Sequence, residues 1–173
     1  MSPFFSRRPV GTLRGLRGSA RGFTLMELVV TLALIGLMAL MAAPLAEMTV
    51  KRGRERELRQ ALSEIRKAID RYKVASDQGQ IAKAVGDSGY PPNLRVLVEG
   101  VVNQRSPTGE KLYFLRRLPR DPFASDDLRD NESTWGLRAY SSPADAPMPG
   151  VDVYDVHSRS RSPGINGIPY ERW

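Results

Sequence analysis

Two reactive residue types are scarce in this 173-residue chain, which contains no cysteine and one histidine, His157. Without cysteine the chain has no disulfide framework, no thiolate nucleophile and no zinc–thiolate centre. The sequence also lacks the GxSxG, P-loop, HExxH and dinucleotide-binding patterns that accompany common catalytic sites. We therefore expect a protein that is not an enzyme and that has no resident cofactor.

Acidic side chains are missing from the first 22 residues, which contain five arginines: Arg7, Arg8, Arg14, Arg17 and Arg21. Removing these five from the net charge of +7 leaves +2 for residues 23–173. Because the rest of the chain is close to neutral, a nucleic-acid partner is not expected. A basic flank before an apolar segment instead places the start of that segment in the cytoplasm, by the positive-inside rule.

A charge-free apolar run extends from Leu28 to Ala46 and is nineteen residues long. A membrane-spanning helix needs about 20 such residues, whereas a removable signal peptide has an apolar region of roughly 7–15. A core helix would also show a polar face, which this run lacks. We therefore predict a transmembrane helix over residues 23–46, kinked or loosened near Pro44.

The stretch GFTLMELVVTLALIG, residues 22–36, resembles the processing motif of type IV pilins and type II secretion pseudopilins. The resemblance implies that residues 1–22 are a leader peptide, which a prepilin peptidase removes between Gly22 and Phe23. It further implies that the new amino group of Phe23 is methylated, that Glu27 acts in assembly, and that Pro44 is the helix-loosening proline of many members.

A carboxylate at the head of an apolar helix needs a physical reason, because a charge costs about 2.5–3.5 kcal/mol at the centre of a membrane helix and less near an end. Cleavage would create a cation at Phe23, on the same chain as Glu27 or on a neighbouring copy. A carboxylate–ammonium pair would offset the burial cost and fix the register between subunits. The alternative interpretation is an unpaired glutamate in the headgroup layer.

Residues 47–78 are predicted to continue the helix as an amphipathic segment. Apolar side chains recur there with spacings of three and four, which mark one stripe of a helix packed on a soluble core. The stripe consists of Leu58, Leu62, Ile65, Ile69 and Tyr72, widened by Ala61, Ala68 and Ala75. The rest of the segment is charged. Its basic cluster could contact anionic headgroups, but because the cations alternate with acids, a solvated face or charge pairing between subunits is equally expected. The cluster consists of Lys51, Arg52, Arg54 and Arg56, alternating with Glu55 and Glu57.

The remaining residues, 79–173, predict a small soluble head. Leu94, Leu97 and Val98 fit a short helix that covers a core, and the alternating stretches Trp135–Ser141 and Val151–His157 fit two strands. The predicted fold is α+β: a long N-terminal helix, half membrane and half amphipathic, packed on a small antiparallel sheet. The Tyr-Pro-Pro start at residue 90 and the Leu-Pro-Arg-Asp-Pro-Phe stretch ending at residue 123 strengthen the resemblance to major pseudopilins of type II secretion.

Many major pseudopilins bind calcium in a loop that follows the last strand. Here Arg159 and Arg161 occupy the corresponding stretch, and calcium prefers several oxygen ligands that include carboxylates. A site in this loop is therefore not expected, and Trp173 is expected to fill the core of the head. The remaining calcium-ligand candidates are Asp126, Asp127, Asp130, Asp152 and Asp155.

The resemblance implies a subunit of a type II secretion pseudopilus. It would lie in the bacterial inner membrane, with its head in the periplasm, before joining a periplasmic filament that drives protein export. The implied partners are further copies of the chain, minor pseudopilins, the prepilin peptidase, the inner-membrane assembly platform and, before assembly, membrane lipid. Two alternatives remain open: a minor pilin of a type IV pilus or DNA-uptake system, and a membrane-anchored periplasmic enzyme or binding protein.

Overall fold

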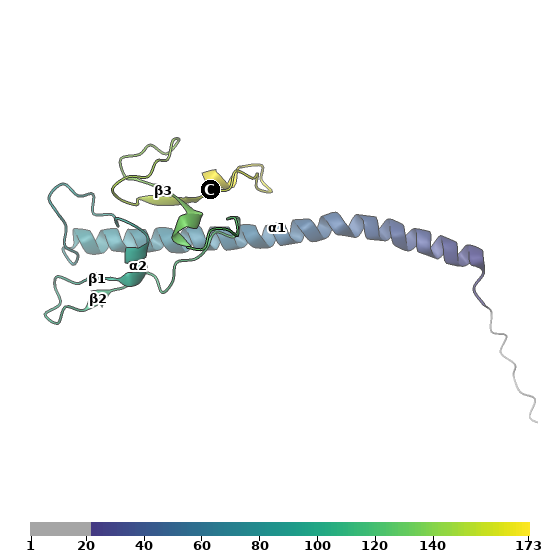
Figure 1. Ribbon diagram of the computed structural model, residues 1–173, viewed down its shortest axis with the longest axis horizontal. Helices are drawn as coiled ribbons and strands as arrows, with labels where there is room; N and C mark the ends of the chain where they lie inside the picture. The colour runs from purple at the N-terminus through teal and green to yellow at the C-terminus, as the bar shows by residue number, and fades with distance from the viewer. Residues whose placement is uncertain (1–21) are drawn as a thin grey trace, which may run out of the picture. The chain divides into compact units, whose positions relative to one another are not determined.

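The computed structural model describes residues 22–173, except the side chains of residues 40–45. The chain divides into two compact units, an N-terminal unit that ends at Ala43 and a C-terminal unit, Pro44–Trp173. The predicted leader arginines lie outside the described residues. In chain order the elements are α1 (Leu25–Asp77), α2 (Arg95–Glu99), β1 (Val101–Val102), β2 (Lys111–Leu112), β3 (Trp135–Arg138) and β4 (Asp155–Ser158), with single 3-10 turns at Glu132–Thr134 and Tyr170–Arg172 (Figure 1).

The long predicted helix is confirmed by α1, a helix of 53 residues that contributes to both units. The last helical residue is Asp77, and two residues later Gly79 adopts the left-handed conformation with φ of 68°. Its N–H donates to the carbonyl of Ser76 over 2.9 Å, which closes the end of the helix. Glycine is favoured at this position because it has no Cβ to clash. Pro44 lies within α1, but its side chain is outside the described part, so the loosening there stays a prediction.

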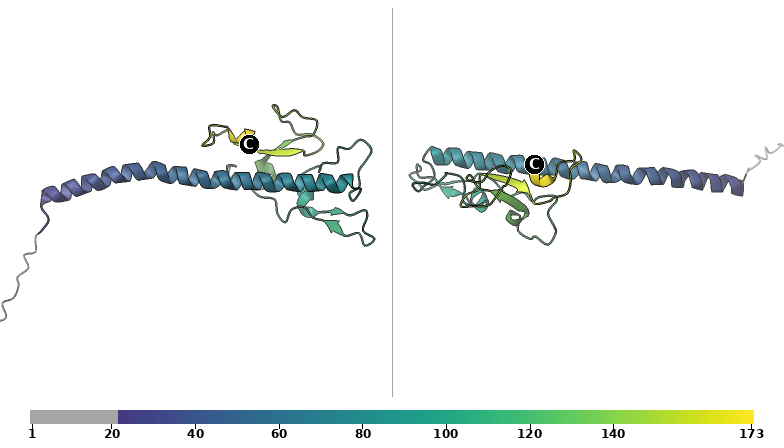
Figure 2. Two further views of the ribbon diagram at one scale, coloured as in Figure 1. Left: turned by 180° about the vertical axis from the view of Figure 1, so that it is seen from behind. Right: turned by 90° about the horizontal axis from the view of Figure 1, so that it is seen from above.

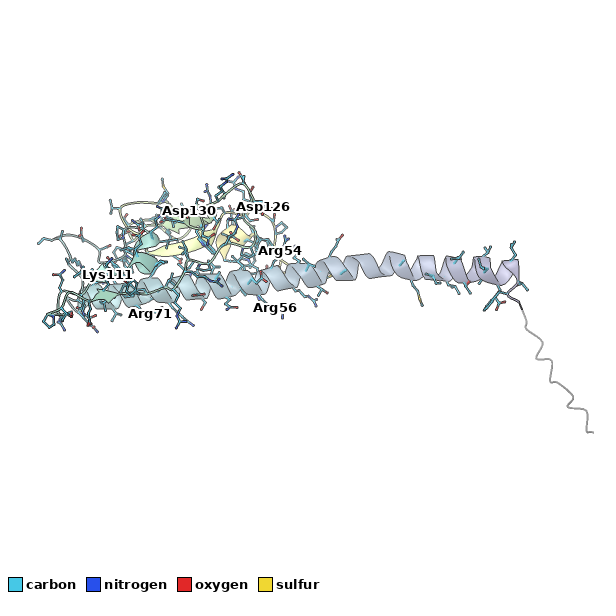
Figure 3. All side chains as sticks on the ribbon, turned by 60° about the horizontal axis from the view of Figure 1, so that its bottom comes forward. Arg54, Arg56, Arg71, Lys111, Asp126 and Asp130 are labelled. Carbon is cyan, nitrogen blue, oxygen red and sulfur yellow. The ribbon has the colours of Figure 1, made fainter. Side chains whose placement is uncertain are left out.

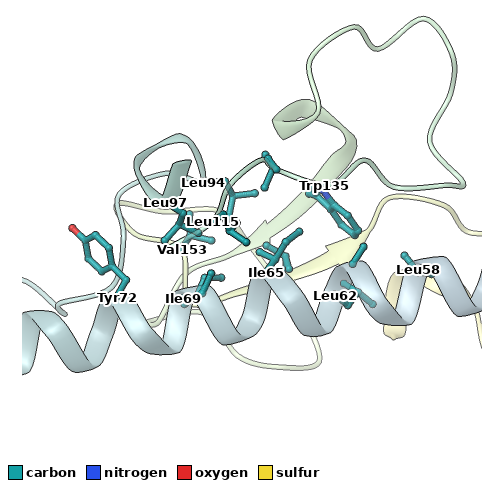
Figure 4. Packing of buried hydrophobic residues seen from close by; sticks show 14 of the residues in the cluster. Leu58, Leu62, Ile65, Ile69, Tyr72, Leu94, Leu97, Leu115, Trp135 and Val153 are labelled. Carbon is teal, nitrogen blue, oxygen red and sulfur yellow. The ribbon is translucent and has the colours of Figure 1, made fainter. Parts of the chain in front are cut away.

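The amphipathic stripe is confirmed by the core of the C-terminal unit. Leu58, Ile65 and Ile69 are completely buried, and Figure 4 shows them pointing from α1 toward the head. The head supplies the facing side chains from α2, the strands and the loops between them. They include Leu94, Leu97, Leu115, Trp135, Val153 and Val156. The helix is therefore fixed to the head by one continuous apolar face.

The short predicted helix is confirmed by α2. Leu97 within it and Leu94 just before it are both fully buried. The predicted single sheet is instead two antiparallel pairs, β1–β2 and β3–β4. The second pair is the predicted one, with Trp135 opposite Ser158 and Arg138 opposite Asp155. The hairpin β1–β2 was not predicted, because its strands have only two residues each and carry no alternating pattern. Figure 2 shows both pairs from two further directions.

The predicted strand Val151–His157 was wrong at its start, and the predicted strand from Trp135 was too long. Val151 is 92% exposed, and pairing with β3 begins only at Asp155. The intervening backbone is held differently: Val153 donates its N–H to the carbonyl of Pro91 over 2.8 Å. Buried Asp152 accepts the N–H of Tyr140 over 2.9 Å, which ends the ladder on the other side. Loop contacts thus replace the expected strand pairing.

Within the residues whose side chains are described, no helical stretch is both long enough and apolar enough to cross a membrane. The predicted run Leu28–Ala46 includes residues 40–45, whose side chains lie outside that part of the chain.

Candidate functional site

The predicted processing motif lies at the start of α1. Gly22 and Phe23 precede the first helical residue, Leu25, and are exposed, Phe23 to 77%. Thr24 caps the helix, because its hydroxyl accepts the N–H of Glu27 over 3.2 Å. Thr24 is thus the N-cap residue of α1. The sequence analysis missed this cap, which uses the backbone N–H of Glu27 and not its carboxylate.

Glu27 itself lies in the first turn of α1 with its side chain exposed. A carboxylate there is stabilised by the partial positive charge of the helix N-terminus. Every described side chain from residue 22 to residue 39 is exposed in the single chain. Large apolar side chains dominate this surface: Phe23, Leu25, Met26, Leu28, Val29, Val30, Leu32, Leu34, Ile35, Leu37 and Met38. Such a surface needs partners that the single chain does not supply.

The C-terminal unit contains a buried acid that the sequence analysis placed wrongly. Glu55 was predicted to belong to a solvated face, but it is only 4% exposed. Its Oε1 accepts the N–H of Ile165 over 2.7 Å and the hydroxyl of Tyr170 over 3.0 Å, and Arg59 lies 3.8 Å from its other oxygen. Burial, together with the hydrogen bond to Glu55, raises the pKa of Tyr170 to about 12.

Further α1 cations hold the same C-terminal segment, residues 160–173, which we call the clasp. Lys51 donates to the carbonyl of Pro163 over 2.8 Å. Arg66 donates to Asp155 over 2.7 Å and to the carbonyl of Trp173 over 2.9 Å. The Arg59 guanidinium lies 4.5 Å from the centre of the Trp173 ring. Trp173 is half-buried and packs against the edge of the core, whereas the sequence predicted that it would fill the core.

The clasp is also joined to the Leu-Pro-Arg-Asp-Pro-Phe segment. Phe123 stacks on Tyr170 with ring centres 4.0 Å apart. Asp121 is 1% exposed and accepts the hydroxyl of Ser158 over 2.6 Å and the N–H of Phe123 over 2.8 Å. These contacts explain the acid and the aromatic residue of this segment: both connect a loop to β4 and to the clasp.

The structure does not bring the candidate calcium ligands together. Asp152 accepts from Ser88 and from Tyr140, in the loop before β4. Asp155 pairs with Arg66, and Asp130 pairs with Arg95 over 2.7 Å. Asp126 and Asp127 lie exposed in one loop, where Ser125 donates to Asp127. Across the described residues, no three acidic or histidine side chains are placed to hold a metal ion together.

A comparison with known protein families first shows which class of protein the N-terminal segment is similar to. Residues 17–43 match the family model described as the prokaryotic N-terminal methylation motif. This segment contains the Gly22–Phe23 junction and Glu27, the residues on which the predicted resemblance rests. A long helix packed on small antiparallel β-structure is consistent with a pilin-like protein.

One curated relative gives a more specific similarity. The chain is 26% identical over 141 residues to the type II secretion system core protein G of Klebsiella michiganensis, which covers 79% of this chain and 91% of the relative. No solved structure matches the chain significantly. Motif and relative together confirm the resemblance predicted from the sequence: this is a pilin-like chain, similar over most of its length to a pseudopilin of type II secretion.

Proposed function

We propose that this chain is a structural subunit of a type II secretion pseudopilus. A prepilin peptidase cuts it between Gly22 and Phe23, and the new amino group of Phe23 is methylated. Copies of the mature chain then assemble, with minor pseudopilins and an inner-membrane platform, into a periplasmic filament that drives export. Before assembly residues 23–46 span the inner membrane, with their start in the cytoplasm and the C-terminal unit in the periplasm.

This proposal rests on the difference between the exposed N-terminal helix and the packed C-terminal unit. The methylation motif includes the start of α1, where every described side chain from residue 22 to residue 39 is exposed in the single chain. The C-terminal unit, by comparison, has a continuous core of its own. A chain that folds one unit completely and leaves an apolar helix uncovered suits a subunit that is stored in lipid and then packed against its own copies. The structural role requires no active site.

The role of Glu27 separates the proposal from a purely local explanation. The cap at Thr24 needs only the backbone N–H of residue 27 and tolerates any side chain there, whereas an ion pair with the Phe23 ammonium requires the charge. We therefore expect Glu27→Gln and Glu27→Ala both to be processed normally and both to impair filament assembly. Glu57→Ala, which removes an exposed glutamate of α1 outside the motif, is the matched control.

The experiment is expression of the full chain with its peptidase, followed by N-terminal sequencing, mass measurement of Phe23 and electron microscopy of sheared filaments. We expect the mature chain to begin at methylated Phe23. A mature chain that begins elsewhere would refute the processing step. Normal filaments from Glu27→Gln, with loss only in Glu27→Ala, would show that assembly requires a polar side chain at residue 27 and not its charge.

A further inference from the structure

The outward face of α1 in the C-terminal unit carries a row of cations, with the exposed acids Glu64 and Asp70 beside it. Opposite the core stripe, exposed residues recur with spacings of three and four, which keeps them on one side of the helix. We call this set the outer stripe: Arg56, Gln60, Ser63, Lys67, Arg71 and Val74. It contains three cations and no acid. Arg56 and Lys67 have no acidic partner among the described residues, and Arg71 donates to the backbone carbonyl of Phe114 over 2.6 Å.

The acidic counterpart is a loop of the head, residues 125–130, which we call the acidic loop. Asp126 and Asp127 are neighbours there, and both are exposed. The Arg120 guanidinium fixes the loop from inside, because it donates to the carbonyls of Ser125 and Leu128. Hydrogen bonding from Ser125 lowers the pKa of Asp127, so that carboxyl stays ionised well below neutral pH.

Several other carboxylates of the C-terminal unit already have cationic partners in the same chain. Asp130 and Glu132 pair with Arg95, Asp77 pairs with Lys73, and Glu171 lies 3.4 Å from Arg161. Glu57 and Glu64 border a hollow that Arg117 and Arg120 also line. Arg129, the cation of the acidic loop, borders a separate hollow with Arg116 and Arg117. Among the described residues, Asp126 and Asp127 are two adjacent negative charges that form no ion pair, and Arg120 acts on Asp127 only as a nearby charge.

The two charged surfaces lie on opposite sides of the C-terminal unit. Figure 3 shows Asp126 and Asp130 on the head side of α1, and Arg56 and Arg71 along its opposite edge. Two different, complementary patches on one subunit form a heterologous contact, which produces a ring when the rotation closes and an open helical filament when it does not. A second copy of the chain therefore satisfies both patches, whereas anionic lipid would satisfy only the outer stripe.

We propose that the acidic loop of one copy contacts the outer stripe of the next, with Asp126 and Asp127 facing Arg56 and Lys67. This inference rests on the proposed function, since it assigns a surface to the filament contact. Exposed ion pairs contribute little affinity each, but complementary charge orients two partners and excludes wrong registers. The contact therefore sets the orientation of neighbouring heads, while the uncovered apolar helices supply most of the buried area.

The cysteine-free chain allows a direct test. Two differently tagged full-length chains are co-expressed, one with Lys67→Cys and the other with Asp126→Cys, and the filaments are oxidised. We expect a disulfide-linked pair that carries both tags. The control replaces Asp126→Cys by Asp145→Cys, an exposed acid in another loop, and should give little product. Filaments that yield no cross-link, or yield equal amounts in both experiments, would overturn the inference.

A charge-reversal rescue supplies an independent readout. Asp126→Lys with Asp127→Lys should reduce filament yield about tenfold, because each reversed exposed contact is worth a few-fold. Adding Arg56→Glu and Lys67→Glu to the same chain should restore yield. No loss, or no restoration in a folded chain, would contradict the contact. If unaltered chains form no filaments, both the proposed function and this surface fail. If they form filaments but the Lys67→Cys and Asp126→Cys pair gives no cross-link, only the surface fails.

A third experiment measures binding of the chain to vesicles that contain phosphatidylglycerol, to distinguish lipid from a second copy as the partner of the outer stripe. Loss of vesicle binding in Arg56→Glu with Lys67→Glu, together with no cross-link in filaments of the Lys67→Cys and Asp126→Cys chains, would assign the outer stripe to anionic lipid and overturn the inference. Retained vesicle binding with the cross-link present supports the contact between copies.

Discussion

The two units of this chain differ in where their apolar side chains find partners. In the C-terminal unit Leu58, Ile65 and Ile69 are completely buried against the head, and polar contacts such as those of Glu55 close the remaining edges. In the N-terminal unit the described apolar side chains stay exposed, from Val30 at 45% to Leu25 at 84%. One unit is stabilised by its own chain, whereas the other depends on surroundings, which is why folding and assembly should respond to different substitutions.

The largest effect on folding should come from the core stripe. Ile65→Ala removes a side chain with no exposed surface and should lower the free energy of unfolding by about 2–5 kcal/mol, because the cavity left behind refills only partly. Leu32→Ala, at a position 59% exposed in the N-terminal unit, should change it by less than about 0.5 kcal/mol. Urea unfolding of the full chain in mild detergent, followed by tryptophan fluorescence, measures both. Similar losses in the two variants would abolish the contrast between the units.

The next largest effect on the free energy of unfolding should come from removal of the buried Glu55 carboxylate. Glu55→Ala leaves the N–H of Ile165 and the hydroxyl of Tyr170 without their acceptor, and we expect a loss of about 2–4 kcal/mol. Glu55→Gln keeps one acceptor oxygen and should lose roughly half as much, since the hydrogen bonds are no longer charge-assisted. Glu57→Ala is the exposed control. The same unfolding measurement applies, and an unchanged stability in Glu55→Ala would show that Glu55 does not contribute to holding the clasp on α1.

Glycine substitutions should change stability in opposite directions in the two units. A Cβ at Gly136 in β3 would overlap the ring of His157, so Gly136→Ala should lower the free energy of unfolding by about 1–3 kcal/mol. No atom lies within 4 Å of a Cβ at Gly36. Gly36→Ala should instead raise helix stability by up to about 1 kcal/mol, which circular dichroism during heating would detect. A destabilising Gly36→Ala would indicate a contact at that face.

The smallest effect is a pH dependence confined to the C-terminal unit. The folded chain holds the pKa of Tyr170 at about 12, above the ordinary value of 10.0. The unfolded chain therefore loses this proton first, so the Tyr170 contribution is complete below pH 10 and declines as the pH rises toward 12. The difference in unfolding free energy between the unaltered chain and Tyr170→Phe should narrow over this window. A constant difference from pH 8 to pH 11 would show that Tyr170 is not held in its neutral form.

Much of the fold could be predicted because α1 is long and strongly periodic. The stripe from Leu58 to Tyr72 kept its spacing through five side chains, so both the helix and its buried face were correct. The strand at Val151 was predicted wrongly because alternation also occurs in loops that are fixed by side chains, here by Asp152 accepting from Tyr140. Strands of two residues, as in β1, are too short to carry a pattern at all.

Residues of the candidate site also differ in whether local sequence or long-range contacts determine them. Gly22, Phe23 and Glu27 were predicted together because the motif that contains them is contiguous in sequence. The N-cap at Thr24 is equally local and could have been predicted from the sequence. Glu55 could not be placed, because its partners Ile165 and Tyr170 are 110 and 115 residues away, and its neighbours along α1 are charged and exposed.

The sequence by itself determined the helix, its division into an apolar and an amphipathic half, the buried stripe and the processing motif, because each depends on residues within a few turns of one another. Only the tertiary structure decided that Glu55 is buried, that residues 160–173 fasten to α1, and that the candidate aspartates are dispersed among cations and hydroxyls. A carboxylate is stable in the interior only where donors converge on it, and those donors come from parts of the chain that folding alone brings together.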